Sequence, residues 1–237
     1  MVHHQHDESW YKSTWVHRAW FASGCTTVLI SLAKSMLITI SGAGASTTTP
    51  LTWLRLAFAV LLGYVLADLV SGVYHWAMDN YGSPETPVIG SIIYTFVDHH
   101  QHPMELNKCD TAALLYQAAG VATAVFLPVN ICSNDPVLLA FVGVLSGFGI
   151  FNIKFHTWAH TPKRKLPPLV AALQDAGIIV PWSQHGAHHR PPLNTNYCSV
   201  SGICNRVLDK YKVFMAMEVV LFRVTGVRPR SWAEPDS

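Results

Sequence analysis

The sequence predicts an all-α, multispanning membrane protein with about four transmembrane helices in two hairpins and a histidine-rich site on one membrane face. Half of the 237 residues are hydrophobic and only 13% are charged, whereas about 25% are charged in a typical soluble domain. Four segments are long and apolar enough to cross a bilayer, which takes about 20 helical residues. The chain has 13 histidines but only 5 cysteines. These proportions exclude disordered chains, collagens and disulfide scaffolds.

The four apolar segments are expected at residues 23–45, 51–73, 111–131 and 136–153. The first contains Lys34, the second contains Arg55 and Asp68, and the other two contain no charged residue. The connections within the first pair and within the second pair are short, which favours two helical hairpins. We therefore divide the chain into a polar N-terminal segment, residues 1–22, and a membrane domain, residues 23–237.

Basic residues avoid the two expected hairpin tips. Of the sixteen Lys and Arg residues, all except Lys34 and Arg55 lie before the first segment, between the second and third, or after residue 153. The positive-inside tendency then places both termini and the middle loop on one face, with the histidines. The net charge of +2 is too balanced for a nucleic-acid-binding surface.

Two apolar stretches in the C-terminal part are not expected to span the membrane. Residues 166–182 contain three prolines and Asp175, so we expect an interfacial or re-entrant helix rather than a fifth crossing. Residues 207–224 alternate apolar and charged side chains at helical spacing, which predicts one amphipathic helix on the membrane surface. The five cysteines are odd in number and contain no CxxC pair, so we expect free thiols in a reducing compartment.

Nine histidines form four groups along the chain. Residues three or four apart on a helix share a face, so His156 and His160 can bind one ion together. His185 can do the same with His188 or His189. Asp79 lies four residues after His75 and is a candidate ligand or a carboxylate that orients His75. His17, His3, His4 and His6 lack this context and are expected to be structural or solvated. The four groups are His75; His99, His100 and His102; His156 and His160; and His185, His188 and His189.

The number of histidines predicts two metal ions, because a structural zinc needs only four ligands. Imidazole suits zinc, copper, iron and nickel, and the absence of HExxH argues against a zinc protease. Two irons held mainly by imidazoles can activate dioxygen, which favours attack on an unactivated C–H bond of a lipid. A metal transporter is an alternative that predicts ionisable side chains along a path through the spans. A membrane localisation domain is another alternative, but it would leave the paired histidines without a purpose.

Seven motifs in order make the chain similar to one family. They are ADLVSGVYHWAMDNYGSPETPVIG, HHQHP, HTWAH, KLPPLVAALQDAG, HGAHH, NYCSVSG and VRPRSWAEP, spread over about residues 13–236. The chain resembles the plant plastidial desaturases of the fatty acid desaturase 4 type, which form a family with the plasmanylethanolamine desaturases and the bacterial CarF proteins. His102 and Asp98 depart from the plant pattern, which has an aromatic residue and a glycine at these positions.

The resemblance implies a membrane acyl-lipid desaturase that uses two iron ions and dioxygen, with ferredoxin as the electron donor. It implies palmitate of plastid phosphatidylglycerol as the substrate, and a chloroplast thylakoid or envelope membrane with the histidine face and both termini in the stroma. An ether-lipid (plasmanylethanolamine-type) desaturase or a lipid hydroxylase remains open. No catalytic side chain beyond the metal ligands is expected, and Asp79 and His102 are extra or orienting candidates. The implied ligands are His75, His99, His100, His156, His160, His185, His188 and His189.

Overall fold

The computed structural model describes residues 8–42 and 49–233. His3, His4 and His6, and most of the first predicted connection, lie outside the described residues. The chain divides into two compact units. The first contains the described residues up to Ala67 together with Lys108–Lys154, and the second contains Asp68–Asn107 and the described residues from Phe155 onward.

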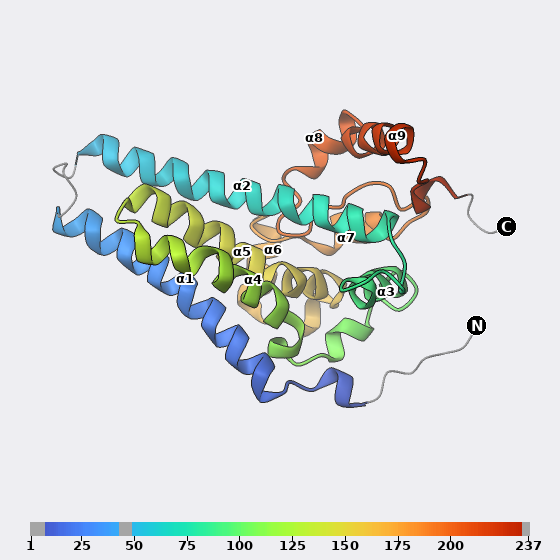
Figure 1. Ribbon diagram of the computed structural model, residues 1–237, viewed down its shortest axis with the longest axis horizontal. Helices are drawn as coiled ribbons and strands as arrows, with labels where there is room; N and C mark the ends of the chain where they lie inside the picture. Colours follow the sequence, from blue (N-terminus) through green and yellow to red (C-terminus); the bar gives the residue numbers. More distant parts are fainter. Residues whose placement is uncertain (1–7, 43–48, 234–237) are drawn as a thin grey trace. The chain divides into compact units, whose positions relative to one another are not determined.

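The described residues form helices and no strand (Figure 1), which confirms the all-α prediction. Four helices are long: α1 (Trp15–Ser41), α2 (Pro50–Asn80), α4 (Thr111–Cys132) and α5 (Pro136–His160). The shorter helices are α3 (Gly90–His99), α6 (Pro168–Asp175), α7 (Trp182–His188), α8 (Asn205–Lys210) and α9 (Val213–Thr225). Single 3-10 turns cover η1 (Glu8–Tyr11), η2 (Glu105–Lys108), η3 (Lys163–Lys165) and η4 (Arg230–Trp232).

The four long helices are the ones that are long and apolar enough to cross a membrane, as predicted. Helix α4 matches its apolar segment to within one residue, whereas each of the other three extends well beyond its segment at one end. Helix α1 begins at Trp15, because the Thr14 side chain and His17 form a capping box that satisfies the first backbone donors. Helices α2 and α5 continue past the predicted ends at 73 and 153 into the polar residues of the histidine groups. The two i, i+4 pairs on these helices therefore lie on regular helix, as their spacing predicted.

In the first unit, α1 and α4 pack closely (Figure 1). A Cβ atom at Gly24 would lie 2.6 Å from the Cβ of Ala119 and 2.8 Å from its backbone, so the glycine lets the two backbones approach. Lys34 donates to the carbonyl oxygens of Asn130, at 2.8 Å, and Ser133, at 2.7 Å. These bonds satisfy free carbonyls at the end of α4, so the charge inside the first span has a structural partner.

We expect Gly24→Ala to lower the melting temperature of the detergent-solubilised protein, because the added methyl group overpacks the contact with α4 at a cost of about 1–3 kcal/mol. Gly149→Ala in α5 is the control, since nothing lies within 4 Å of a Cβ at that position. Thermal unfolding followed by circular dichroism tests this. Equal melting temperatures for the two variants would contradict the close packing of α1 on α4.

In the second unit, the buried carboxylate of Asp68 near the middle of α2 organises the segment that follows α7. It accepts hydrogen bonds from the backbone N–H groups of Ser201, Gly202 and Cys204, at 2.7, 2.8 and 3.0 Å. Tyr197, from the same segment, packs with Trp76 and Phe214 in a buried cluster. Asp68 thus holds residues 197–204 against α2.

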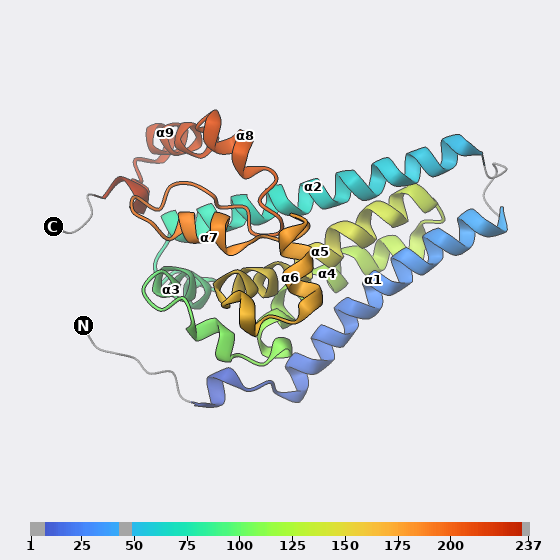
Figure 2. The same ribbon diagram turned by 180° about the vertical axis from the view of Figure 1, so that it is seen from behind.

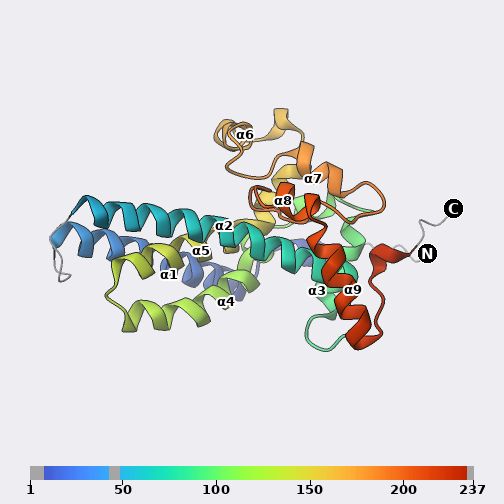
Figure 3. The same cartoon turned by 90° about the horizontal axis from the view of Figure 1, so that it is seen from above.

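The prediction of one helix over residues 207–224 is wrong. The segment forms α8 and α9, separated by Lys212 in the left-handed region with φ of 53° (Figure 3). Asp209 accepts from the backbone N–H of Asn196, whereas Phe214 packs against Trp76. On a continuous helix these two side chains would point about 140° apart. The break lets each side chain reach its own partner.

The stretch 166–182 contains a helix of only eight residues, α6 (Figure 2), which ends before Gly177 with φ of 69°. It does not form a fifth long helix, as predicted, and its position at the membrane interface stays a prediction. All five cysteines are free thiols, also as predicted, with Cys109 and Cys198 buried and Cys132 exposed.

Candidate metal centre

Two groups of potential metal ligands lie in the second unit, and within each group one ligand atom from every residue lies within 4.8 Å of the others. The five-histidine group consists of His99, His156, His160, His185 and His189. The Asp79 group consists of His75, Asp79, His100 and His188. All eight histidines expected as ligands are therefore brought together, with Asp79 among them, while His102 belongs to neither group.

Four helix ends supply these side chains. Helix α2 provides His75 and Asp79, and α5 provides His156 and His160. The end of α3 provides the pair His99–His100, and α7 and its end provide His185 and the pair His188–His189. Consecutive residues on a helix point about 100° apart. Each adjacent pair therefore places one histidine in the five-histidine group and the other in the Asp79 group.

The ring nitrogens of the five-histidine group point at one another at short range. The Nε2 atom of His156 lies 2.6 Å from that of His99 and 2.9 Å from that of His185. The Nε2 atom of His160 lies 2.9 Å from His99 Nε2, and His189 Nε2 lies 3.2 Å from His185 Nε2. An ion with bonds of about 2.1 Å to imidazole would hold ligands at right angles about 3 Å apart. The spacing therefore fits a shared ion.

The Asp79 group converges on one carboxylate oxygen. Asp79 Oδ2 lies 3.3 Å from His75 Nε2, 3.3 Å from His100 Nε2 and 3.2 Å from His188 Nε2. None of these four buried atoms has a hydrogen-bond partner of good geometry among the described residues. Buried polar atoms normally have hydrogen-bond partners. Three nitrogens and one oxygen that converge without such partners fit the ligand set of a bound cation.

Two backbone carbonyls orient two of the three imidazole rings of the Asp79 group. The Nδ1 atom of His75 donates to the carbonyl of Tyr197 at 2.9 Å, and that of His188 donates to the carbonyl of Thr195 at 2.8 Å. Each bond fixes the tautomer and leaves Nε2 with its lone pair toward the group. Sequence reasoning missed this role, because a backbone carbonyl leaves no residue signature, although the NYCSVSG motif contains Tyr197.

Burial keeps His99, His185 and His189 in the neutral form that binds metals. Desolvation lowers the pKa of His99 and His185 well below the ordinary histidine value, and the neighbouring imidazoles lower it further. The same causes lower the pKa of His189 to about 2. These rings therefore carry free lone pairs at neutral pH, as metal ligation requires.

The other two described histidines, His102 and His17, have partners of their own. His102 donates from Nδ1 to Asp98 Oδ1 at 3.1 Å, and its side chain is 39% exposed. His17, in the first unit, takes part in the α1 cap and stacks on Tyr116 with ring centroids 4.2 Å apart. His17 is structural, as predicted, and His102 lies at the solvent side of the α3 end.

Comparison with known proteins gives the family. The profile of the lipid desaturase domain matches residues 64–232. The chain is similar to chloroplastic fatty acid desaturase 4 of Arabidopsis thaliana, with 50% identity over 94% of this chain and 67% of that protein. Fatty acid desaturase 4-like 2 of the same plant is 48% identical over 95% of this chain and 78% of its own length.

A more distant relative is the plasmanylethanolamine desaturase of Myxococcus xanthus, at 34% identity over 76% of this chain and 64% of that protein. No solved structure matches. The matched domain contains every residue of the two ligand groups. The desaturase function that the resemblance implied is thus confirmed at the level of the family: the chain belongs to the lipid desaturases.

Proposed function

We propose that this protein is an acyl-lipid desaturase that holds two iron ions, one in the five-histidine group and one in the Asp79 group, and uses dioxygen to introduce a double bond into a fatty acyl chain. The observation that carries the proposal is the convergence of eight imidazoles and one carboxylate in two adjoining groups. A single structural zinc would need only half of these ligands. The family match supports the same reaction class.

When bound, the two irons would supply the dioxygen activation that breaking an unactivated C–H bond requires. The chain's own residues hold the ions and exclude water, since His75, His185 and His188 are almost fully buried. The carbonyls of Thr195 and Tyr197 keep two of the rings in the ligating tautomer. No side chain is needed as a general base.

For the substrate we infer palmitate of phosphatidylglycerol, in a chloroplast membrane, with ferredoxin as the electron donor and the histidine face toward the stroma. Support comes from three relatives named as chloroplastic fatty acid desaturases, at 46–50% identity over most of this chain. The four candidate membrane spans agree with an integral membrane protein.

An ether-lipid desaturase is the second candidate. It is favoured by the similarity to the plasmanylethanolamine desaturases of Myxococcus xanthus, at 34% identity, and of mouse, at 29%. The ligand groups do not separate the two reactions, because the product depends on how the lipid chain is seated. A metal transporter finds little support, since Lys34 and Asp68 in the candidate spans are hydrogen-bonded to backbone groups.

Expression in a host that lacks the activity, followed by mass spectrometry of each lipid class, tests the proposal. We expect an unsaturated derivative of palmitate to accumulate in phosphatidylglycerol, and not in cells that express the matched His156→Ala variant. New vinyl ether lipids would favour the second candidate instead. Unchanged lipids in cells that contain iron-loaded protein would contradict both.

Substitution of His102 tests which histidines of the middle loop bind the metal. We expect His102→Tyr to retain bound iron and desaturation, because this side chain contacts Asp98 and belongs to neither ligand group. His100→Ala should lose both, because His100 Nε2 faces Asp79. Iron content and lipid products of the two purified variants provide the comparison. If His102→Tyr empties the site while His100→Ala leaves it filled, the middle loop ligates through His99 and His102.

A further inference from the structure

The C-terminal turn η4, Arg230–Trp232, lies against the end of α2 that carries the Asp79 group. Resting on the two-ion centre proposed above, we propose that this turn is a clamp that positions Asp79 and His75 for one of the two ions. Arg230 acts as a positioning residue, because its contacts reach the ligands through the backbone and not through the ligating atoms.

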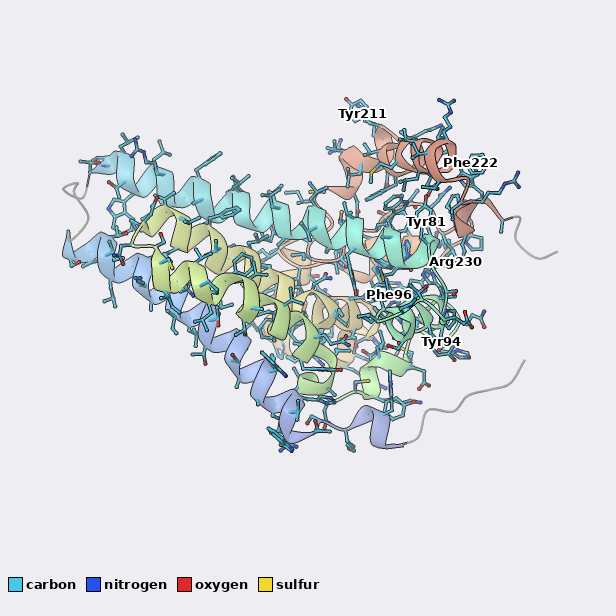
Figure 4. The ribbon with its side chains drawn as sticks, viewed as in Figure 1. Tyr81, Tyr94, Phe96, Tyr211, Phe222 and Arg230 are labelled. Carbon is cyan, nitrogen blue, oxygen red and sulfur yellow. The ribbon has the colours of Figure 1, made fainter. Side chains whose placement is uncertain are left out.

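Arg230 binds four carbonyl oxygens at the end of α2. Its Nε donates to Asp79 at 2.5 Å, Nη1 donates to Gly82 at 2.6 Å, and Nη2 donates to Met78 at 2.6 Å and to Tyr81 at 3.2 Å. Figure 4 shows Arg230 next to Tyr81. The last carbonyls of a helix have no partner within the helix and attract a cation. The planar guanidinium has five donors spread over three nitrogens, so it can bind all four carbonyls, whereas a lysine has only three donors on a single nitrogen.

The next residue extends the clamp to His75. The backbone N–H of Ser231 donates to Asn80 Oδ1 at 3.0 Å. The side-chain amide of Asn80 donates to the hydroxyl of Tyr197 at 3.0 Å. Tyr197 in turn provides the carbonyl that fixes the His75 ring. A series of hydrogen bonds therefore connects the C-terminal turn to Tyr197, whose carbonyl fixes the tautomer of His75.

A buried carboxylate fastens the turn in place. Glu218 of α9 is 1% exposed and accepts from Ser231 Oγ at 3.0 Å, from Trp232 Nε1 at 2.8 Å and from Trp76 Nε1 of α2 at 3.1 Å. These three hydrogen-bond donors compensate the negative charge of the Glu218 carboxylate. The turn, α9 and α2 are therefore joined through a single side chain.

The clamp should act on one ion and not on the other. Among the described residues, neither carboxylate oxygen of Asp79 has a hydrogen-bond donor of good geometry. The position of this side chain therefore depends on the backbone of α2, which Arg230 holds at the Asp79 carbonyl. The five-histidine group contains no residue of α2. Loosening the residues that orient metal ligands typically costs 10–100-fold in affinity. We therefore expect a selective loss at the Asp79 group.

The test is anaerobic Fe²⁺ titration of the full-length protein in detergent, with Mössbauer spectra of the ⁵⁷Fe-loaded samples. Arg230→Gln should bind one ion as the wild type does and the other 10–100-fold more weakly, and Arg230→Lys should be intermediate. Arg228→Gln is the matched control, because Arg228 is exposed and lies over the Phe222 ring. It should bind both ions normally. Trp232→Phe, which removes one donor to Glu218, should weaken the same ion to a smaller extent.

The alternatives give different results. A purely structural role predicts that Arg230→Gln and Trp232→Phe lose both ions together with a lowered melting temperature, and this would overturn the clamp. Two ions bound with wild-type affinity in Arg230→Gln would overturn it as well. A wild-type protein that binds fewer than two ions would instead overturn the two-ion centre, and with it any selective effect of Arg230.

Discussion

Replacing His185 by alanine should abolish desaturation and lower the bound iron. His185 is fully buried at the centre of the five-histidine group, with its Nε2 2.9 Å from His156 Nε2 and 3.2 Å from His189 Nε2. Alanine offers no donor and leaves a cavity lined by the remaining imidazoles. Changes to residues that merely orient ligands already cost about 10–100-fold, so removal of a ligand should cost at least about 100-fold in activity.

The measurement is product formation in the lipid pool together with iron per purified chain. His17→Ala is the control, because it removes part of the α1 cap and a stacked ring in the first unit but no member of either ligand group. It should keep its iron. Substitution of His99, His100, His156 or His189 by alanine should repeat the His185 result. Full iron content in His185→Ala would contradict the role of His185 as an iron ligand.

Asp79→Asn should remove one of the two ions. Asp79 is the only carboxylate in either ligand group within the described part of the chain, and its Oδ2 faces three imidazole nitrogens at 3.2–3.3 Å. Asparagine keeps the shape but loses the negative charge that a hard cation needs in a buried site. We expect about half of the wild-type iron and activity at least about 100-fold lower.

Asp98→Asn is the matched control, since Asp98 also contacts a histidine, His102, but lies outside both groups. It should retain iron and activity. Iron quantification and lipid analysis of both variants distinguish the two carboxylates. If Asp79→Asn retains two ions and full activity, Asp79 only orients His75, and the Asp79 group has three protein ligands.

The candidate spans and the grouping of the histidines could be predicted because they depend on local pattern. An uncharged run such as residues 111–131 has few stable arrangements outside a bilayer, and an HxxxH spacing places His156 beside His160 on any helix. The sequence did not reveal that α2 and α5 continue beyond the apolar segments. That extension depends on polar side chains finding partners in the folded chain, as Asn80 does with Tyr197.

Four features of the fold and the site could not be predicted, because each depends on residues that are not neighbours in the sequence. The Tyr197 carbonyl meets His75 across 122 positions, and Arg230 meets the Asp79 carbonyl across 151. The break at Lys212 arises because Asp209 and Phe214 have different partners. Asp79 stood beside His75 in the sequence, but only the fold shows that His100 and His188 face the same oxygen.

The amount of metal in the purified wild-type protein tests the central claim most directly. Elemental analysis by mass spectrometry, after purification from iron-supplemented cells, should find about two irons per chain, one for each ligand group. Mössbauer spectra of the same sample should show two inequivalent sites, because one group contains five imidazoles and the other contains a carboxylate. Zinc alone, or no bound metal in a folded sample, would contradict the two-iron desaturase.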